Sequence, residues 1–263
     1  MPFIEKDGLR FYQFRIFEGF PIFHAVLTRQ GGYSLSPFDS LNFGGTVGDD
    51  PKAVLKNHQK IYQILNFDFS SRFDVWQVHG TDIVCADSPR DLNTDHQKAD
   101  GILTNKPNIT LFMRFADCVP ILLADPVKMV IGIVHAGWQG TSMMVSQKAI
   151  EQLSKCYGSD PGDILAGIGP SICQSCYPVG KEVYEAFAAN FGEVVDGFFK
   201  KENNQFYLDL WEANRFTLEM AGVSKIEVSG LCTACHLDDW FSHRKEDRRT
   251  GRFGVLMSLE KNE

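Results

Sequence analysis

The feature that most constrains the fold of this chain is the alternation of short apolar runs with stretches of helical periodicity. The apolar runs have the length of strands and cover residues 22–28, 83–86, 109–115, 119–124, 129–134, 164–168, 225–229 and 253–259. Runs of this kind are typical of strands buried in a sheet. Alternating with helices, they predict a mixed α/β or α+β fold, with a layered mixed β-sheet core flanked by helices.

The helical stretches are predicted at residues 51–65, 181–191 and 209–221, and from Gly140 and Thr141 to about Cys156. In the last of these, apolar side chains recur on one side of the helix, and Gly158 is placed to end it. No linker rich in proline, glycine or serine divides the chain. We therefore expect residues 1–263 to form a single domain.

Composition limits the classes of function. A formal net charge of −7 and a pI near 5.5 argue against a general basic surface that binds nucleic acid, although a few clustered arginines could bind a small anion. The start of the chain lacks the pattern of a secretion signal, and no apolar stretch approaches the roughly 20 residues that span a bilayer. We expect a cytoplasmic monomer whose seven cysteines stay reduced.

Three residues far apart in the chain, His79, Cys118 and His135, each stand beside an apolar run and a turn or break. Side chains at the same end of neighbouring strands point into one crevice, so these three can converge. Two imidazoles and one thiolate leave a fourth position open on zinc, which is typical of a catalytic site, and they also suit copper. His96, in a predicted surface loop at 87–98, is left outside the site as a solvated side chain.

The other cysteines include two pairs with metal-knuckle spacing, Cys173 with Cys176 and Cys232 with Cys235. The 55 residues between the pairs exceed the roughly 15–20 of a compact zinc ribbon. The two cysteine pairs form a four-thiolate site only if the fold brings them together. The alternative is that the two cysteine-bearing turns simply flank the pocket.

Several motifs resemble the YfiH-like family, also called laccase-domain or polyphenol oxidase proteins. The matching stretches are Thr28-Arg29-Gln30-Gly31-Gly32-Tyr33-Ser34, Gln77-Val78-His79-Gly80, Ala99-Asp100-Gly101, Ala116-Asp117-Cys118-Val119-Pro120, His135-Ala136-Gly137-Trp138, Phe241-Ser242-His243-Arg244 and Thr250-Gly251-Arg252. They occur in order and span nearly the whole chain. In the resembling family, neither cysteine pair is a metal shell that we would carry over.

The resemblance implies a purine nucleoside phosphorylase with a fold related to cysteine-dependent toxin deamidases. Its implied substrates are phosphate with adenosine, inosine, guanosine or 5′-methylthioadenosine, and adenosine deamination is an implied additional activity. The implied cofactor is Zn²⁺, with Cu²⁺ as an alternative. Zinc suits the deamination because it lowers the pKa of a bound water to about 7.

Phosphorolysis also requires groups that bind phosphate and the nucleoside. Arg29 and Arg244 are the phosphate candidates, since guanidinium groups bind oxyanions through a planar fork, although both could instead form surface ion pairs. Asp100 could orient a metal-bound histidine or bind a ribose hydroxyl, whereas a structural role is as well supported for Asp117. Trp138 could stack on a purine or pack against the core.

Three alternatives remain open from the sequence. Cys118 with His135 could act as a metal-free thiolate and base in a hydrolase or deamidase. A copper-dependent polyphenol oxidase is the second, although seven histidines without a His-X-His pair argue strongly against a multicopper centre. The third is a zinc-stabilised binding module, which differs from an enzyme in whether the fourth coordination position is open.

Overall fold

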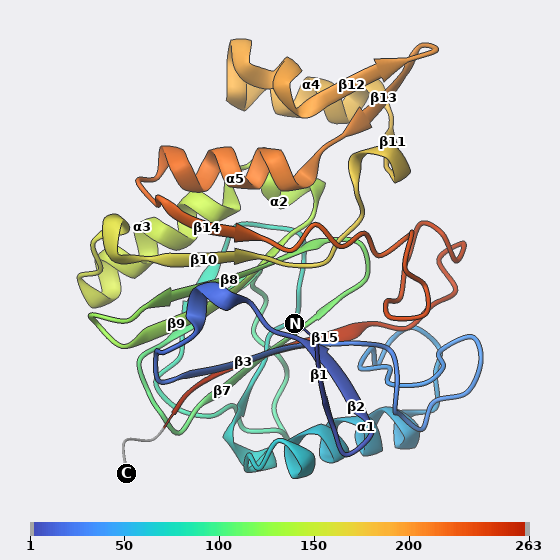
Figure 1. The fold of residues 1–263 in the computed structure, drawn as a ribbon, viewed down its shortest axis with the longest axis vertical. Helices are drawn as coiled ribbons and strands as arrows, with labels where there is room; N and C mark the ends of the chain where they lie inside the picture. Colours follow the sequence, from blue (N-terminus) through green and yellow to red (C-terminus); the bar gives the residue numbers. More distant parts are fainter. Residues whose placement is uncertain (1–2, 261–263) are drawn as a thin grey trace.

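The computed structural model describes residues 3–260, and stacked layers organise them. Two six-stranded mixed sheets lie face to face in the middle of the molecule, as Figure 1 shows. Helices α3 and α5 cover the outer face of one sheet, and α1 covers the outer face of the other. The expectation of a layered mixed-sheet core flanked by helices is therefore confirmed. Whether residues 1–263 form one domain stays a prediction.

The first sheet carries the site and has the order β14-β10-β8-β9-β6-β5. Its strands are β5 (Ile83–Cys85), β6 (Gly101–Thr104), β8 (Val119–Asp125), β9 (Val130–Ala136), β10 (Leu165–Ile168) and β14 (Lys225–Val228). Strands β8 and β9 pair antiparallel over their whole length, from Val119 opposite Ala136 to Asp125 opposite Val130. The end of β9 and the start of β8 therefore lie at the same edge of the sheet.

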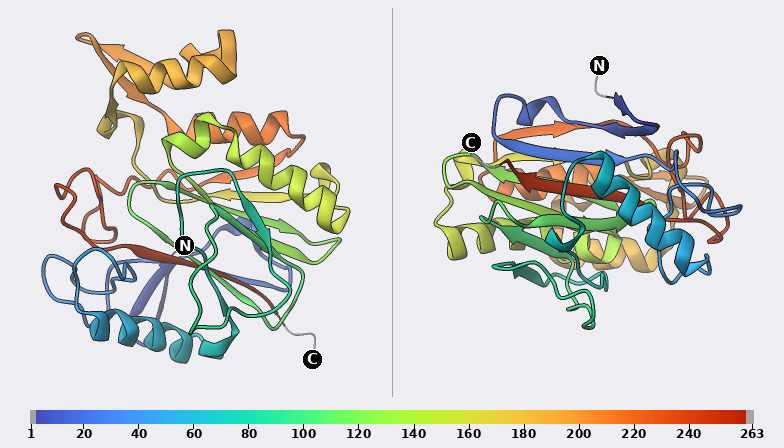
Figure 2. Two further views of the ribbon diagram at one scale, coloured as in Figure 1. Left: turned by 180° about the vertical axis from the view of Figure 1, so that it is seen from behind. Right: turned by 90° about the horizontal axis from the view of Figure 1, so that it is seen from below.

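The second sheet has the order β1-β2-β3-β15-β7-β4. Its strands are β1 (Phe3–Lys6), β2 (Leu9–Tyr12), β3 (Ile22–Leu27), β4 (Arg72–Phe73), β7 (Thr110–Phe115) and β15 (Phe253–Leu259). Near the other end of the chain, β15 pairs with both β3 and β7. This pairing brings the loops at residues 28–50 and 229–252 together at one end of the sheets, where Arg29 N–H donates to the Asp239 carbonyl (Figure 2).

Alternation along the strands explains why the central strands of both sheets are buried on both faces. In β8, Ile121 and Leu123 pack against the helices, whereas Leu122 and Ala124 pack against the other sheet. In β7, Phe112 faces α1 while its neighbours face the inter-sheet core. Side chains two apart share a face of a strand, so a continuous apolar run supplies both faces at once.

Helices α1 (Pro51–Ile64), α4 (Lys181–Phe191) and α5 (Leu210–Met220) agree with their predicted positions. The prediction of a single helix after Gly140 is wrong in one respect. The segment forms two helices, α2 (Trp138–Ser142) and α3 (Val145–Tyr157). Met144 between them has a positive φ of 60°. Asn214 of α5 bonds to Thr141 of α2 at 3.0 Å and to Ser146 of α3 at 2.7 Å, so tertiary hydrogen bonds support the break.

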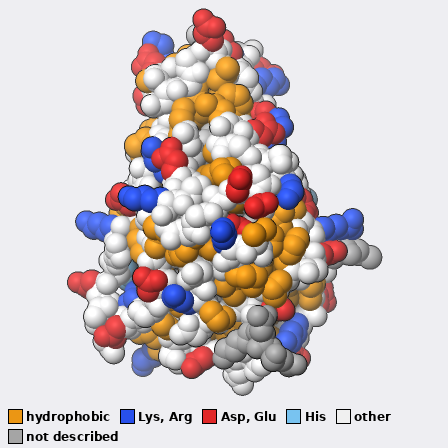
Figure 3. All heavy atoms as spheres, turned by 90° about the vertical axis from the view of Figure 1, so that its left-hand side faces the viewer, with side chains coloured by type: hydrophobic (Ala, Val, Ile, Leu, Met, Phe, Trp, Pro, Cys, Tyr) orange, Lys and Arg blue, Asp and Glu red, His pale blue; other side chains and the backbone are white. Residues whose placement is uncertain are grey.

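A small unit at residues 178–208, which we call the cap, stands on α2 and α5. It contains α4 and a three-stranded sheet of β11 (Pro178–Val179), β13 (Gln205–Leu208) and β12 (Phe199–Glu202). Figure 3 shows the cap as the narrow upper part of the molecule, with acidic and basic side chains interspersed on the face drawn. Short 3₁₀ helices complete the description at Arg15–Phe17, Phe69–Ser71, Pro161–Asp163, Gln174–Cys176 and Gly192–Phe198.

The predicted strands all correspond to observed strands, with bounds shifted by a residue or two. The prediction missed β1, β2, β4, β6 and the three strands of the cap. Among residues 3–260, no helix combines the length and the apolar character that crossing a bilayer requires.

Candidate metal centre

The three predicted ligands converge at the edge where β8 begins and β9 ends. Cys118 directly precedes β8, and His135 on β9 lies opposite Pro120. His79 comes from the loop between β4 and β5. One donor atom from each side chain lies within 4.8 Å of the other two, and the Cys118 sulfur is 4.0 Å from His79 Nε2. A tetrahedral zinc ion with ordinary bond lengths separates such donors by about 3.5 Å, so small side-chain movements complete the shell.

Asp100 fixes the loop that carries His79. Its carboxylate accepts hydrogen bonds from the backbone N–H groups of Val78 (3.2 Å), His79 (2.9 Å) and Gly80 (2.6 Å). His79 has a positive φ of 61°, a conformation that costs a residue other than glycine about 1–2 kcal/mol. Three bonds to one buried carboxylate offset that cost and direct the imidazole toward Cys118.

The same carboxylate orients His135. Asp100 Oδ1 lies 2.8 Å from His135 Nδ1, which leaves Nε2 as the nitrogen directed to the site. Burial alone would raise the pKa of Asp100, but its hydrogen bond with His135 lowers it below the usual value. A carboxylate bonded to the far nitrogen of a ligand histidine sets its tautomer and increases its basicity.

Cys118 and His135 form an electrostatically coupled pair. Burial opposes charge on both, yet His135 lowers the pKa of the Cys118 thiol to about 6. In the same way, burial opposes the imidazolium, while Cys118 and Asp100 together raise the pKa of His135 to about 9. The thiolate that a metal or a nucleophilic reaction requires is therefore available at neutral pH.

Gly137 leaves space for the side chains of Cys118 and His79. A β-carbon at this position would lie 3.0 Å from the Cys118 sulfur and 3.0 Å from His79 Cδ2. Contacts that short are tighter than ordinary van der Waals packing. The φ of Gly137 is −75°, which any residue can adopt, so backbone conformation does not require a glycine here. The glycine is required because a side chain would prevent the close approach of Cys118 and His79.

Two cavities meet at this centre, and His79, Ala116, Cys118 and His243 border both. The first, of about 530 Å³, is lined on its polar side by Asp117, Gln139, Arg244, Asp247 and Arg248, and also by Ile172, Tyr177, Trp138 and Leu210. The second, of about 510 Å³, is lined by residues 44–47 and by Trp76, Gln77, His96, Arg114, Phe115, His135 and Arg252. Together they are large enough for a small-molecule substrate.

The structure separates the predicted substrate residues into two groups. Arg244 and Trp138 line the first cavity, although Trp138 also packs against the helix-side core. Asp100 is fully buried, so it contacts His79 and His135 and has no surface for a ribose hydroxyl. Of its two predicted roles, the geometry fits orientation of a histidine, and substrate binding by Asp100 stays a prediction.

Arg29 lines neither cavity. It pairs with Glu246 at 2.9 Å, donates to the carbonyls of Asp39 and Leu237, and lies 4.3 Å from the centre of the Phe241 ring. The guanidinium is thus used to join the loops at residues 28–50 and 229–252. These contacts are those of the ion-pairing alternative, and phosphate binding by Arg29 stays a prediction.

Asp117 stabilises the wall of the first cavity through hydrogen bonds within the protein. Its carboxylate accepts hydrogen bonds from Thr233 Oγ1 at 2.6 Å and from the Arg244 backbone N–H at 2.6 Å. Its φ of 77° turns the chain immediately before Cys118. Asp117 therefore ties the loop that carries Cys118 to the segment that carries Arg244, in agreement with a structural role.

Sequence reasoning missed His96 and its buried partner. His96 Nε2 lies 3.1 Å from Asp74, whose side chain is 1% exposed and is also paired with Arg72, Arg90 and Arg114. Burial opposes the charge of Asp74, but His96 and the arginines hold its pKa well below the usual range. His96 borders the second cavity, so the expectation of a solvated loop histidine was wrong. No local pattern marked Asp74 as its partner.

His243, Arg248 and Tyr177 are further cavity residues that were not selected from the sequence. His243 borders both cavities, and burial together with the charge of Arg252 lowers its pKa, which keeps it neutral at pH 7. The histidine and Arg244 belong to one motif, which was the available signal. Tyr177 follows Cys176 and lies under Arg244, whose guanidinium carbon is 4.9 Å from its ring centre.

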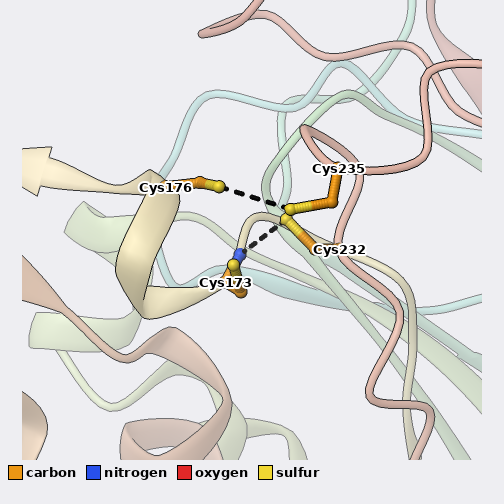
Figure 4. A group of neighbouring side chains, drawn as sticks. All are labelled: Cys173, Cys176, Cys232 and Cys235. Atoms are coloured by element: carbon orange, nitrogen blue, oxygen red, sulfur yellow. Dashed lines mark hydrogen bonds between the residues drawn. The ribbon is translucent and has the colours of Figure 1, made fainter.

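The four cysteines with knuckle spacing also converge. Their sulfur atoms all lie within 4.8 Å of one another, as the close view in Figure 4 illustrates. None of the four lines the first cavity, although the neighbouring Ile172 and Tyr177 do. In residues 3–260 these four and the His79, Cys118, His135 group are the two clusters that could hold a metal ion. Neither cluster resembles the set of about ten ligands, largely histidines, that a multicopper centre requires.

A family model described as multi-copper polyphenol oxidoreductase laccase matches residues 23–260. The chain belongs to this family. The description names a chemistry, whereas the two ligand clusters of this member do not assemble the histidine pairs of a multicopper oxidase. Membership therefore establishes the fold and its relatives, and the activity has to be argued from the site.

Relatives within the laccase family carry a different activity in their names. The chain is 37% identical over 241 residues to "Purine nucleoside phosphorylase YlmD" of Bacillus subtilis, with 89% of this chain and 87% of the relative covered. It is also 37% identical over 241 residues to a purine nucleoside phosphorylase of Deinococcus radiodurans, covering 91% and 90% of the two chains.

Solved structures of the family superpose over nearly the whole chain. YlmD from Geobacillus stearothermophilus matches with a TM-score of 0.92 and 31% identity, over 99% of both chains. A hypothetical protein YfiH from Bacillus licheniformis matches with a TM-score of 0.91 and 34% identity, over 98% of this chain and 99% of that one. The YfiH-like fold expected from the motifs is confirmed.

Proposed function

We propose that the protein is a zinc-dependent purine nucleoside phosphorylase acting on adenosine, inosine, guanosine or 5′-methylthioadenosine, with adenosine deamination as a side activity. One observation carries the proposal: His79, Cys118 and His135 converge on the boundary of two cavities, each of which is lined by two arginines. The names of the relatives support the same reaction. We place this activity in a cytoplasmic monomer that engages neither nucleic acid nor membrane.

The residues present fit a divalent metal. Because Asp100 bonds to His135 Nδ1, Nε2 is the nitrogen that would bind the metal in place of its proton, and the Cys118 thiolate and His79 Nε2 would supply the other two donors. Three protein ligands with a cavity on either side correspond to an open site. When bound, the metal would supply Lewis acidity and a water of lowered pKa, which phosphorolysis and deamination can both use.

The first cavity suits phosphate. Arg244 and Arg248 give it two cations, and a planar guanidinium binds an oxyanion through two parallel hydrogen bonds. Arg244 is held over Tyr177 and donates to the Pro178 carbonyl at 2.6 Å, so its position is set before an anion arrives. Phosphate there lies next to the metal ligands, since Cys118 and His79 line the same cavity.

The second cavity suits the purine. Trp76 and Phe115 offer aromatic faces, and Gln77 and Arg114 offer polar groups beside them. With the base there, C1′ of the sugar lies at the boundary of the two cavities. An oxygen of phosphate then bonds to C1′ as the bond from C1′ to the purine nitrogen breaks. The purine leaves with the electron pair and takes up a proton.

The direct test is the phosphate dependence of base release. Metal-replete protein should release hypoxanthine and ribose 1-phosphate from inosine only when phosphate is present, and Cys118→Ala should abolish the release. Cys156→Ala, which changes an exposed cysteine outside the site, is the matched control and should retain full activity. Absence of release from inosine, adenosine and 5′-methylthioadenosine would overturn the proposal.

The second candidate is a metal-free cysteine hydrolase or deamidase. Cys118 would be the nucleophile, His135 the base that takes its proton, and Asp100 the carboxylate that orients the histidine. His79→Ala separates the two candidates, because it should abolish a metal enzyme while a Cys118–His135 pair keeps part of its activity. Release that persists in His79→Ala protein after chelation would favour the hydrolase.

Copper-dependent oxidation of phenols is the remaining alternative. Two histidines and one cysteine can also bind copper, and the family description names copper chemistry. Oxidase turnover that rises with copper loading, while phosphate-dependent base release stays absent, would support it.

A further inference from the structure

The two cysteine pairs form one compact cluster, although 55 residues separate them in the sequence. Figure 4 shows the sulfurs of Cys176, Cys232 and Cys235 directed toward one point, with Cys173 beside them. Cys176 and Cys235 have sulfurs 3.5 Å apart, and the backbone N–H of Cys173 donates to the Cys232 sulfur at 3.3 Å. All seven cysteines of the chain are free thiols in this structure.

Regular backbone pairing builds the cluster. Ser171 and Cys232 form a parallel bridge, in which the Thr233 N–H donates to the Ser171 carbonyl at 3.1 Å. Each pair is closed by a turn, since Cys176 N–H donates to the Cys173 carbonyl and His236 N–H donates to the Cys232 carbonyl. The two turns therefore present their sulfurs to each other from a fixed frame.

From this geometry we infer that Cys173, Cys176, Cys232 and Cys235 bind a second zinc ion in a closed, four-thiolate structural site. Zinc–sulfur bonds of about 2.3 Å in a tetrahedron place sulfurs about 3.8 Å apart. The observed sulfurs all lie within 4.8 Å of one another, so zinc binding requires the sulfur–sulfur distances to shorten by about 1 Å at most. Four protein ligands leave no position for substrate.

Further features of the cluster fit a metal better than ordinary packing. An N–H donor to a cysteine sulfur stabilises the thiolate form that zinc requires, and Cys173 N–H supplies one. Cys232 is buried, Cys173 and Cys176 are half-buried, and Cys235 is exposed, which gives an ion a path to the sulfurs. A purely apolar contact would not need four sulfurs gathered from two separate turns.

The inferred ion would brace one wall of the first cavity. Ile172 and Tyr177, which flank the first cysteine pair, line that cavity. Thr233, inside the second pair, donates to Asp117 beside Cys118. The site therefore joins the start of the cap to the loop that carries Cys118 and to the segment that leads to Arg244. The metal site itself does not depend on the proposed nucleoside chemistry.

The test counts zinc in full-length protein purified under reducing conditions and freed of loose metal by gel filtration. Wild-type protein should retain about two zinc ions per chain, and both Cys118→Ala and Cys176→Ser should retain about one. The control Cys156→Ser should retain both. A Cys118→Ala protein without zinc would overturn the inference, whatever the wild-type protein does with nucleosides.

A second measurement keeps the test independent of variant folding. Wild-type protein is treated with an alkylating reagent before and after chelation, and the modified cysteines are located by mass spectrometry. The four cluster cysteines should be protected until the metal is removed, whereas exposed Cys156 should react in both samples. Equal labelling of the cluster before and after chelation, or disulfides among these cysteines, would overturn the inference.

Discussion

The His79, Cys118, His135 centre and the four-cysteine cluster differ in how their ligands are supplied. The first takes single residues from a loop, the start of β8 and the end of β9, and it borders two cavities. The second takes two pairs from two short turns and lies outside the cavity linings. The three-residue centre thus borders open space, whereas the four cysteines lie outside both cavity linings.

In the proposed roles, this difference separates a catalytic metal site from a structural metal site within one chain. A mixed set of two imidazoles and one thiolate leaves room for a reacting molecule, and its ligands depend on Asp100 and Gly137 for their placement. A four-thiolate set leaves no such room and joins two segments of the backbone. Asp117 links the two regions, because it precedes Cys118 and bonds to Thr233.

The largest expected effect comes from removing one thiolate from each site in turn. Cys118→Ala should lower phosphate-dependent base release by more than about 100-fold, since loss of a mere supporting partner of a metal ligand costs 10–100-fold. Cys176→Ser leaves the three ligands of the open site unchanged and should retain measurable turnover. Steady-state rates with inosine at saturating phosphate measure both. Equal loss in the two variants would remove the distinction between the sites.

Asp100→Asn should have the next largest effect. The variant keeps the shape of the side chain but removes the charge that orients His135 and supports the loop of His79. Metal affinity or activity should fall by about 10–100-fold. The zinc of the four-cysteine cluster should be retained, which titration with a competing chelator would show. Unchanged affinity at the open site would mean that Asp100 does not tune it.

The pH dependence of thiol alkylation in chelator-treated protein should separate the two sites further. Burial opposes the Cys118 thiolate but His135 lowers its pKa to about 6, whereas burial and the neighbouring Cys235 raise the pKa of Cys176 to about 11. Only thiolates react, so labelling of Cys118 should fall below pH 6 and stay level above pH 7. Labelling of Cys176 should still increase at pH 9.

At pH 7, Cys118 should react about 10–100-fold faster than Cys176, after allowance for the lower nucleophilicity of the more acidic thiol. Peptide mapping of a short pulse of reagent at each pH gives both rates from one sample. Parallel pH profiles for the two residues would contradict the electrostatic difference between the sites.

The smallest effect is expected on stability. Structural zinc sites contribute directly to folding, so Cys176→Ser should lower the Tm by about 5 °C or more. Cys118→Ala, which removes an ion from the open site, should lower it less. Thermal unfolding of both variants beside Cys156→Ser gives the comparison. A larger decrease in Tm for Cys118→Ala would show that the structural role does not belong to the four-cysteine cluster.

The sequence predicted the interior of the fold better than its periphery. Strands β8 and β9 are buried on both faces, so each leaves an uninterrupted apolar run. Strand β12 of the cap carries Lys200, Lys201 and Glu202 and has no comparable pattern. The division between α2 and α3 depends on bonds from Asn214 on a distant helix, which no local pattern encodes.

The candidate site shows the same division. The convergence of His79, Cys118 and His135 could be predicted because each stands beside a core strand or a recognisable turn. The convergence of the two cysteine pairs was left undecided. Arg29 has the chemistry of a phosphate ligand, but Glu246, far along the chain, occupies its guanidinium. His96 was excluded for want of a partner, and that partner, Asp74, lies 22 residues earlier. Long-range pairing decided these roles.

The contrast between an open and a closed site is tested most directly with cobalt in place of zinc. In Cys176→Ser protein the cobalt occupies the open site alone, and in Cys118→Ala protein it occupies the four-cysteine cluster alone. Addition of inorganic phosphate, followed in the visible absorption spectrum, should perturb the first cobalt and leave the second unchanged. A spectrum that responds to phosphate in the cluster, or stays unchanged at the open site, would contradict the account.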